Sequence, residues 1–195
     1  MGREFELKFA ATPEGFAAVK AMYADYQYIA MESTYYDTVD RKILKMGGML
    51  RKRTENGLAF WTLKTPGDMD SRCELEVQTN SVFVAIPELC KLGAPEWLLQ
   101  FNSDNLVPAS GARYHRVAKL IDTADGSVEL ALDEGVFLQG DKQVPFWEIE
   151  VELKEGEDQA VHSVAKILQG VPGVQLQKEN KYQRACKCSK ADKQA

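Results

Sequence analysis

Charged residues that alternate with large apolar residues are the feature of this sequence most suited to chemistry. In residues 4–9 (EFELKF) every second residue is charged and the others are Phe or Leu. Carboxylates bind hard divalent cations, while Arg and Lys bind anions such as phosphate. A surface that carries both signs could therefore hold a metal ion together with an anionic ligand.

The same alternation recurs along the chain. It is found at residues 72–78 (RCELEVQ), 128–133 (VELALD) and 146–154 (FWEIEVELK), and less cleanly at 49–53 (MLRKR), where Lys52 falls on the opposite face. Residues 58–64 (LAFWTLK), with one charge, give weaker support. A single strand of this kind is most simply an exposed strand with one wet face, and its charges would then meet only water. Recurrence indicates instead a charged interior, which is unfavourable unless acids, cations, metal and an anionic ligand compensate one another.

These runs predict strands that position the charged residues. Successive side chains of a strand point to opposite faces, so each run has one charged and one apolar face. Hairpin signals stand at Asn56-Gly57 and Asp125-Gly126. About eight strands of this kind could close into a barrel, with alternate residues pointing into the lumen. The expected fold is therefore α+β: an eight-stranded antiparallel β-barrel, or tunnel, with a charged lumen and flanking helices.

Three helices are expected, at residues 13–25, 81–100 and 157–169. Thr12 is the predicted N-cap of the first, and Gly170 ends the third. Pro87 and Pro95 are expected to kink or split the second. Apolar residues recur at helical spacing on the predicted buried faces: Phe16, Val19, Met22 and Tyr23; Phe83, Ile86, Leu89 and Cys90; Val161, Val164, Ala165 and Leu168.

Composition places limits on the function. The chain has 195 residues, of which 45% are hydrophobic and 27% charged, as expected for one compact domain. A net charge of -5 argues against general attraction to nucleic acid or membranes. No apolar run could span a bilayer and no secretory segment is evident, so a cytoplasmic protein is expected. The four cysteines lack zinc-ligand spacing and are expected to be reduced.

Nine segments, taken in order, resemble the CYTH superfamily, also called triphosphate tunnel metalloenzymes. They are EFELK, YYDTVD, LRKR, LK, RCELEV, RYHR, ELALDEG, WEIEVELKEG and NKYQRA. The likeness covers nearly the whole chain and is closest to the CYTH domain of bacterial inorganic triphosphatases. It implies a single CYTH domain over residues 1–186, followed by a tail, 187–195, that is expected to fray. It also implies Mg²⁺ or Mn²⁺ as cofactor.

The resemblance assigns roles to the charged residues. Glu4 and Glu6 are implied as catalytic metal ligands, and Lys8 as the catalytic residue that positions the phosphate or the attacking water. The other implied metal ligands are Asp133, Glu148, Glu150 and Glu152. The implied substrate-binding residues are Lys8, Arg51, Arg53, Lys64, Arg72, Arg116 (with Arg113 as the weaker candidate on that strand), Lys181 and Arg184. The roles of Glu74, Glu76 and Glu129 stay open.

Triphosphate chemistry is consistent with these roles. Arg forks suit phosphate oxygens bidentately, and carboxylates gather a metal ion that orients the phosphate for in-line attack by water. The expected function is hydrolysis of inorganic triphosphate to pyrophosphate and phosphate. The alternatives are a class IV adenylate cyclase, a thiamine triphosphatase, and a non-catalytic binder of polyphosphate or nucleotide. The expected partner is a small-molecule triphosphate, and a homodimer is left open.

Overall fold

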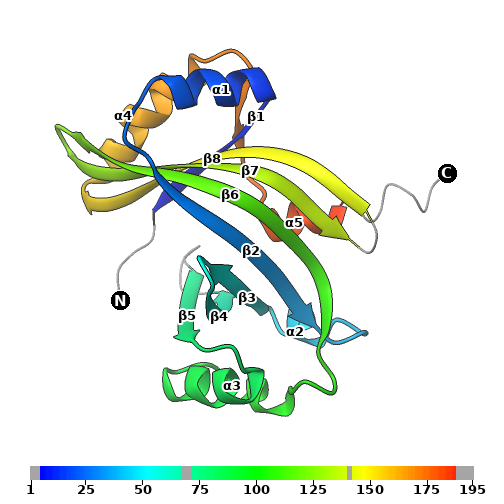
Figure 1. The fold of residues 1–195 in the computed structure, drawn as a ribbon. Coiled ribbons are helices and arrows are strands. Elements are labelled where there is room, and N and C mark those ends of the chain that lie inside the picture. The colour runs from blue at the N-terminus through cyan, green and yellow to red at the C-terminus, as the bar shows by residue number, and fades with distance from the viewer. Residues whose placement is uncertain (1–4, 67–71, 140–141, 188–195) are drawn as a thin grey trace. The chain divides into compact units, whose positions relative to one another are not determined.

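The computed structural model describes residues 5–66, 72–139 and 142–187. Its strands form one antiparallel sheet in the order β5-β4-β3-β2-β6-β7-β8-β1-β9, with helices beside it (Figure 1). The strands are β1 (Glu6–Ala11), β2 (Gln27–Asp37), β3 (Met49–Glu55), β4 (Leu58–Pro66), β5 (Arg72–Gln78), β6 (Val107–Thr123), β7 (Gly126–Gln139), β8 (Lys142–Gly156) and β9 (Val174–Gln177). The helices are α1 (Pro13–Ala21), α2 (Lys42–Lys45), α3 (Val82–Lys91), the 3-10 helix η1 (Glu96–Gln100), α4 (Asp158–Gln169) and α5 (Lys181–Lys187).

The predicted antiparallel sheet with flanking helices is confirmed, with two differences. The sheet has nine strands rather than eight, because the four-residue β9 pairs with β1. Within the described residues, the strands at the two ends of the order, β5 and β9, are not hydrogen-bonded to each other. A tunnel closed by hydrogen bonds therefore stays a prediction.

The chain divides into two compact units. Unit 1 consists of Met1–Ala30, Tyr114–Val136 and Gln143–Lys181, and unit 2 of Met31–Arg113, Phe137–Lys142 and Tyr182–Ala195. The single domain predicted over residues 1–186 stays a prediction. Helix α5 continues through Lys187, and the rest of the predicted tail, 188–195, lies outside the described residues.

Unit 1 has its core on the apolar face of β1, β7 and β8. Phe9 of β1, Leu132 of β7 and Ile149 of β8 pack there against α1 and α4, which lie together over these strands in Figure 1. Helix α4 starts after Glu157 and ends at Gly170, as predicted. The apolar half of each alternating strand is thus covered, and the charged half is left for the opposite face.

Helix α1 is shorter than predicted. Its N-terminus is as expected, with Thr12 Oγ1 accepting a hydrogen bond from the Gly15 N–H at 3.1 Å. It ends at Ala21, however, and Met22 is 47% exposed rather than buried. Asp25 has a φ of 60°, which is left-handed and incompatible with a continuing helix.

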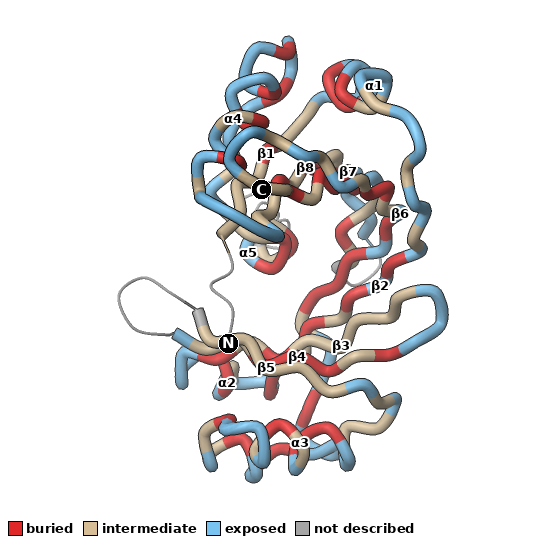
Figure 2. The backbone as a smooth tube through the Cα atoms, turned by 90° about the vertical axis from the view of Figure 1, so that its left-hand side faces the viewer, coloured by how far each residue is buried: buried red, intermediate tan, exposed pale blue. Residues whose placement is uncertain are grey.

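Unit 2 has its core between α3, η1 and the apolar face of β3 and β4. Leu50 and Leu63 pack there against Ile86 and Leu89 of α3, so α3 is buried on one side and exposed on the other (Figure 2). The predicted second helix is split, since η1 begins directly after Pro95. Pro87 lies inside α3.

Three local features of unit 2 are a hairpin, an exposed aromatic residue and a buried acid. The Asn56-Gly57 hairpin is confirmed, with positive φ at both residues. The prediction that Phe83 faces the core is wrong, since the side chain is 65% exposed. Asp37 is buried and accepts hydrogen bonds from the N–H groups of Ile43 and Leu44 at 2.9 and 3.2 Å. It therefore caps α2.

No helix within residues 5–66, 72–139 and 142–187 has the length and apolar character needed to cross a lipid bilayer. The cytoplasmic location stays a prediction. Among the described residues, Cys73, Cys90 and Cys186 are not in disulfide bonds. The reduced state expected for the cysteines stays a prediction.

Candidate functional site

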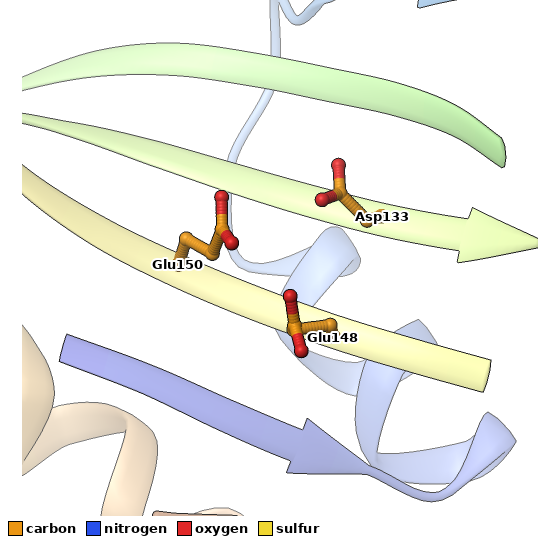
Figure 3. A group of neighbouring side chains, drawn as sticks. All are labelled: Asp133, Glu148 and Glu150. Atoms are coloured by element: carbon orange, nitrogen blue, oxygen red, sulfur yellow. The ribbon is translucent and has the colours of Figure 1, made fainter. Parts of the chain in front are cut away.

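Three carboxylates meet on the charged face of unit 1. Glu148 and Glu150 are two residues apart on β8 and therefore point the same way, and Asp133 lies on the neighbouring β7. One oxygen from each lies within 4.8 Å of the others (Figure 3). Asp133 and Glu148 are fully buried. We call these three residues the acid cluster, and no other such group of metal-ligating side chains occurs among the described residues.

The ammonium group of Lys181 lies among the three carboxylates. This lysine is the first residue of α5 and is buried. Its Nζ is 2.7 Å from Asp133 Oδ2 and 2.8 Å from Glu150 Oε1, and it also donates a hydrogen bond to Glu148. The ring of Tyr114 lies under the ammonium, 5.3 Å from Nζ to the ring centroid. Lys181 thus occupies the centre of the acid cluster.

Arg116 of β6 supplies a second cation to the acid cluster. Its guanidinium binds Asp133 through two hydrogen bonds, of 2.7 Å from Nε and 2.8 Å from Nη2. Nη2 also donates to Glu150 Oε2 at 2.5 Å. A bidentate pair of this kind fixes the orientation of both groups. Arg113, the weaker sequence candidate, is exposed.

The electrostatics keep Glu150 and Lys181 charged. Burial raises the pKa of Glu150, but Lys181 and Arg116 lower it by more, so its pKa lies well below the usual range. Burial lowers the pKa of Lys181, while Asp133, Glu150 and Glu148 raise it well above its ordinary value. Burial, followed by the charge of Asp133, raises the pKa of Tyr114 to about 12. At neutral pH Glu150 is therefore a carboxylate, Lys181 is an ammonium, and the phenol of Tyr114 beside them is neutral.

Three further acids continue the charged face of unit 1, and we call Glu6, Glu129 and Glu152 the outer acids. Glu6 of β1 lies directly opposite Glu152 of β8 in the strand register. Lys8, opposite Glu150, donates a hydrogen bond to Glu6. The predicted ligand Glu4 lies outside the described residues.

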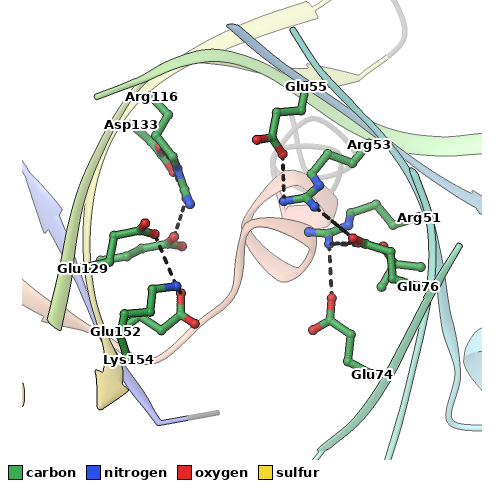
Figure 4. Close-up of polar contacts among 12 residues, drawn as sticks. Arg51, Arg53, Glu55, Glu74, Glu76, Arg116, Glu129, Asp133, Glu152 and Lys154 are labelled. Carbon is green, nitrogen blue, oxygen red and sulfur yellow. Dashed lines mark hydrogen bonds and ion pairs between the residues drawn. The ribbon is translucent and has the colours of Figure 1, made fainter. Parts of the chain in front are cut away.

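Lys154 is a charged residue of this face that the sequence analysis gave no role. Its Nζ is 3.0 Å from Glu152 Oε2 and 3.6 Å from Glu129 Oε1 (Figure 4). Burial lowers the pKa of Lys154, but Glu152 and Glu129 together raise it by more, so the net shift is upward. The sequence already indicated that Lys154 lies on this face, because it continues the alternation of charged and apolar residues in 146–154.

Unit 2 carries cations on its charged face. Arg51 and Arg53 of β3 and Lys64 of β4 form a group that we call the basic row. Glu74 of β5 contacts two of them, with Arg51 Nη2 3.3 Å from Oε1 and Lys64 Nζ 2.5 Å from Oε2. Arg53 Nη2 lies 3.1 Å from Glu76 Oε1 (Figure 4). The structure therefore groups all three predicted phosphate-binding residues of these strands with the two acids whose roles were open.

Thr62 of β4 was not predicted to belong to this group. It is fully buried and lies opposite Arg51 on one side and Glu76 on the other in the strand register. Its hydroxyl donates to Glu76 Oε2 at 2.7 Å and accepts from Arg51 Nη2 at 3.3 Å. The only sequence signal was a polar residue two positions before Lys64.

Two further residues with predicted roles are placed differently. The side chain of Arg72, at the start of β5, lies outside the part of the chain whose side chains are described. Arg184 of α5 lies in unit 2, with its guanidinium carbon 5.0 Å from the centroid of the Phe137 ring. The predicted role of each in substrate binding stays a prediction.

Known proteins with similar structures share the fold of this chain. A candidate adenylate cyclase from Bacillus halodurans has a TM-score of 0.62 and 22% identity, covering 94% of this chain and 98% of that one. A candidate adenylyl cyclase from Hippeastrum, described as having a dominant triphosphatase activity, has a TM-score of 0.60 and 15% identity, covering 96% of each chain. The PH1819 protein from Pyrococcus horikoshii has a TM-score of 0.54 and 25% identity, covering 88% of this chain and 93% of that one.

Sequence comparison gives a family and a curated relative. A model of the CYTH domain matches residues 2–186. An inorganic triphosphatase from Haemophilus influenzae is 29% identical over an alignment 175 residues long, which covers 86% of this chain and 50% of that protein. The chain thus spans about half the length of the curated relative that it matches.

Proposed function

The chain belongs to the CYTH domain family, and from this premise we propose that it is a metal-dependent hydrolase that cleaves inorganic triphosphate to pyrophosphate and phosphate. The observation that carries the proposal is the acid cluster, in which three carboxylates from two neighbouring strands converge on one point. The likeness to an inorganic triphosphatase supports the choice of substrate.

The acid cluster fits a hard divalent cation by its chemistry. Mg²⁺ and Mn²⁺ take oxygen ligands, and Asp133, Glu148 and Glu150 each offer one at a common point. These residues would hold the ion, and the outer acids Glu6 and Glu152 would add further oxygens. When bound, such an ion offsets charge on a phosphate group and stabilises the charge that develops during transfer.

Lys181 must leave the centre of the acid cluster for an ion to enter it. Its Nζ now contacts all three carboxylates. An ammonium group and a divalent cation cannot share one position, so the two are alternatives. Arg116 can keep its bidentate contact with Asp133 in either case, because each carboxylate oxygen accepts one hydrogen bond from the guanidinium and has a second lone pair.

The basic row would bind phosphate oxygens. The guanidinium groups of Arg51 and Arg53 can each donate two parallel hydrogen bonds to a phosphate, and Lys64 adds a point charge. All three are partly exposed and are therefore reachable by a ligand. Lys8 of β1 would position the terminal phosphate or the attacking water. Catalysis would come mainly from preorganised charge.

The proposal is tested by offering substrates in parallel. Purified protein with Mg²⁺ or Mn²⁺ receives inorganic triphosphate, ATP or thiamine triphosphate, and phosphate, pyrophosphate and cyclic AMP are measured. Release of phosphate from inorganic triphosphate, at a higher rate than from the other two, is expected. Cyclic AMP from ATP, faster hydrolysis of thiamine triphosphate, or binding without turnover would each contradict it.

A matched pair of variants ties the activity to the acid cluster. Asp133→Asn removes one carboxylate and should lower kcat by on the order of 10²- to 10³-fold, the scale for one preorganised electrostatic contact. Asp122→Asn makes the same change at an exposed position of β6 and should leave kcat unchanged. Equal activity of the two variants would show that Asp133 is not needed.

A further inference from the structure

We propose that Glu74 and Glu76 are positioning residues, which hold the basic row in an aligned array for phosphate and do not themselves contact metal or substrate. This inference rests on the proposed function, because it assigns a task to two acids within a group that would bind triphosphate. Neither residue was given a role by the sequence.

Each acid joins cations or donors of two different strands. Glu74 contacts Arg51 of β3 at 3.3 Å and Lys64 of β4 at 2.5 Å. Glu76 contacts Arg53 of β3 at 3.1 Å and accepts a hydrogen bond from Thr62 of β4 at 2.7 Å. Both of these acids lie on β5, so the contacts tie three neighbouring strands together on one face.

The strand register explains why these contacts form. Lys64 lies directly opposite Glu74, and Thr62 directly opposite Glu76. Residues two apart on a strand share a face, so both acids and both partners lie on the same side of the sheet. Arg51 is opposite Thr62 on the other edge of β4, within reach of either acid.

Alignment is needed because long cationic side chains are flexible and repel each other. Arg and Lys populate many rotamers in solution, and fixing them for a ligand loses conformational entropy. Acids that bind two cations each restrict those rotamers before the ligand arrives. They also lower the repulsion between the guanidinium groups of Arg51 and Arg53, which are two residues apart.

The surroundings of Glu74 and Glu76 differ from those of a metal site. Within the described residues, the one group of three acids with converging oxygens is the acid cluster of unit 1. In the basic row, three cations face these two acids, and a third acid, Glu55, contacts Arg53 at 3.5 Å. Cations surround the acids here, and this favours an anionic ligand rather than a metal ion.

The sign of the effect on binding separates positioning from simple charge neutralisation. An acid beside an anion site repels the anion, so on charge alone its removal should tighten triphosphate binding. If the acid positions the cations, its removal should weaken binding although a negative charge has been lost. The two explanations therefore predict opposite changes in triphosphate affinity for Glu76→Gln.

Thr62 gives a test that does not change the charge. Its hydroxyl links Arg51 to Glu76 through one accepted and one donated hydrogen bond. Thr62→Val removes both bonds with nearly the same volume, and Thr62→Ser keeps the hydroxyl. If the linkage aligns the basic row, valine should impair binding and serine should restore it.

The experiment compares five proteins: wild type, Glu76→Gln, Thr62→Val, Thr62→Ser and the control Glu88→Gln. Glu88 is a partly exposed acid of α3 whose partner is Lys91, so its variant makes the same charge change outside the basic row. Triphosphate affinity is measured by calorimetry in the presence of a chelator, and kcat and KM are measured with Mn²⁺. Thermal unfolding verifies that each variant is folded.

Glu76→Gln and Thr62→Val should each weaken binding or raise KM by about tenfold, the effect of losing a hydrogen bond to a charged group. Thr62→Ser and Glu88→Gln should stay near wild type. Tighter or unchanged binding by Glu76→Gln, or serine as weak as valine, would overturn the inference. If Glu76→Gln does not fold, the two Thr62 variants decide alone. Wild-type protein that neither binds nor hydrolyses triphosphate would overturn the proposed function itself.

Discussion

The acid cluster of unit 1 and the basic row of unit 2 are built from the same strand pattern but differ in burial and in their balance of charge. In the acid cluster three carboxylates face two cations, and these side chains are at most 15% exposed. In the basic row three cations face the three acids Glu55, Glu74 and Glu76, so acids and cations balance, and the side chains are 16% to 33% exposed. A buried excess of acid suits a small dehydrated cation, while an open row of cations suits a hydrated polyanion.

This difference in burial shows that the alternating pattern of a strand does not by itself determine how much its ion pairs contribute to the free energy of unfolding. Breaking a buried ion pair leaves an uncompensated charge and costs about 3–5 kcal/mol, whereas exposed pairs contribute about 0–1 kcal/mol. The acid cluster should therefore be sensitive to the loss of any partner. In the basic row, the loss of a partner should change the free energy of unfolding only slightly. It should change the affinity for the ligand instead.

The largest effect is expected at Lys181. Lys181→Met removes the ammonium from the acid cluster, so the variant without metal should lose about 3–5 kcal/mol of unfolding free energy. The same change frees the centre of the cluster, so Mn²⁺ should bind at least about tenfold more tightly and restore stability by mass action. Urea unfolding with and without Mn²⁺, together with calorimetry, measures both effects.

The control for Lys181 is Lys154→Met, which removes a lysine that contacts only outer acids among the ion pairs described. If both variants tighten Mn²⁺ binding equally, the gain is a general charge effect, and Lys181 does not compete with the metal. Unchanged Mn²⁺ affinity in Lys181→Met would mean that the ion binds elsewhere.

A smaller effect is expected when arginine is exchanged for lysine in each region. Arg116→Lys loses the bidentate contact with buried Asp133 and should lower the unfolding free energy by about 2–3 kcal/mol. Arg53→Lys makes the same change in the open basic row and should lower it by less than about 1 kcal/mol. Denaturant midpoints of the two variants compare them directly, and similar losses would contradict the contrast drawn between the regions.

The smallest effect is expected among the outer acids. Glu129→Gln weakens one half-exposed ion pair, to Lys154 at 3.6 Å, and should change the unfolding free energy by less than about 1 kcal/mol. A thermal melt shows this as a shift of a few degrees at most. A loss as large as that of Arg116→Lys would mean that burial does not separate the two parts of this face.

Much of the fold could be predicted because the alternating runs fix both the strands and their faces. Phe9, Leu132 and Ile149 lie in the core where the period of two places them. The strand β9 could not be predicted, since four residues of mixed polarity carry no periodic signal and depend on pairing with β1. Phe83 is exposed because Ala85, Ile86 and Leu89 already form the buried stripe of α3.

The site could be predicted only within its strands. Asp133, Glu148 and Glu150 converge because they share a face on adjacent strands, and this is local geometry. The family resemblance implied that Lys181 binds the substrate, whereas in the structure its ammonium group contacts these acids. Its place depends on where α5 packs, which no residue spacing records. The same holds for the partnership of Thr62 with Glu76, which needs the register of β4 and β5.

The distance along the chain between the acid cluster and Lys181 bears on how the protein is made. Lys181 follows Glu150 by 31 residues and Glu148 by 33. A ribosome therefore adds β7 and β8 to the chain before the lysine that offsets part of their negative charge. Until α5 emerges, Arg116 is the one cation of the final cluster that is available to the acids of β7 and β8. We therefore expect these strands to pack only after the last helix has been translated, or with a cation bound from solution.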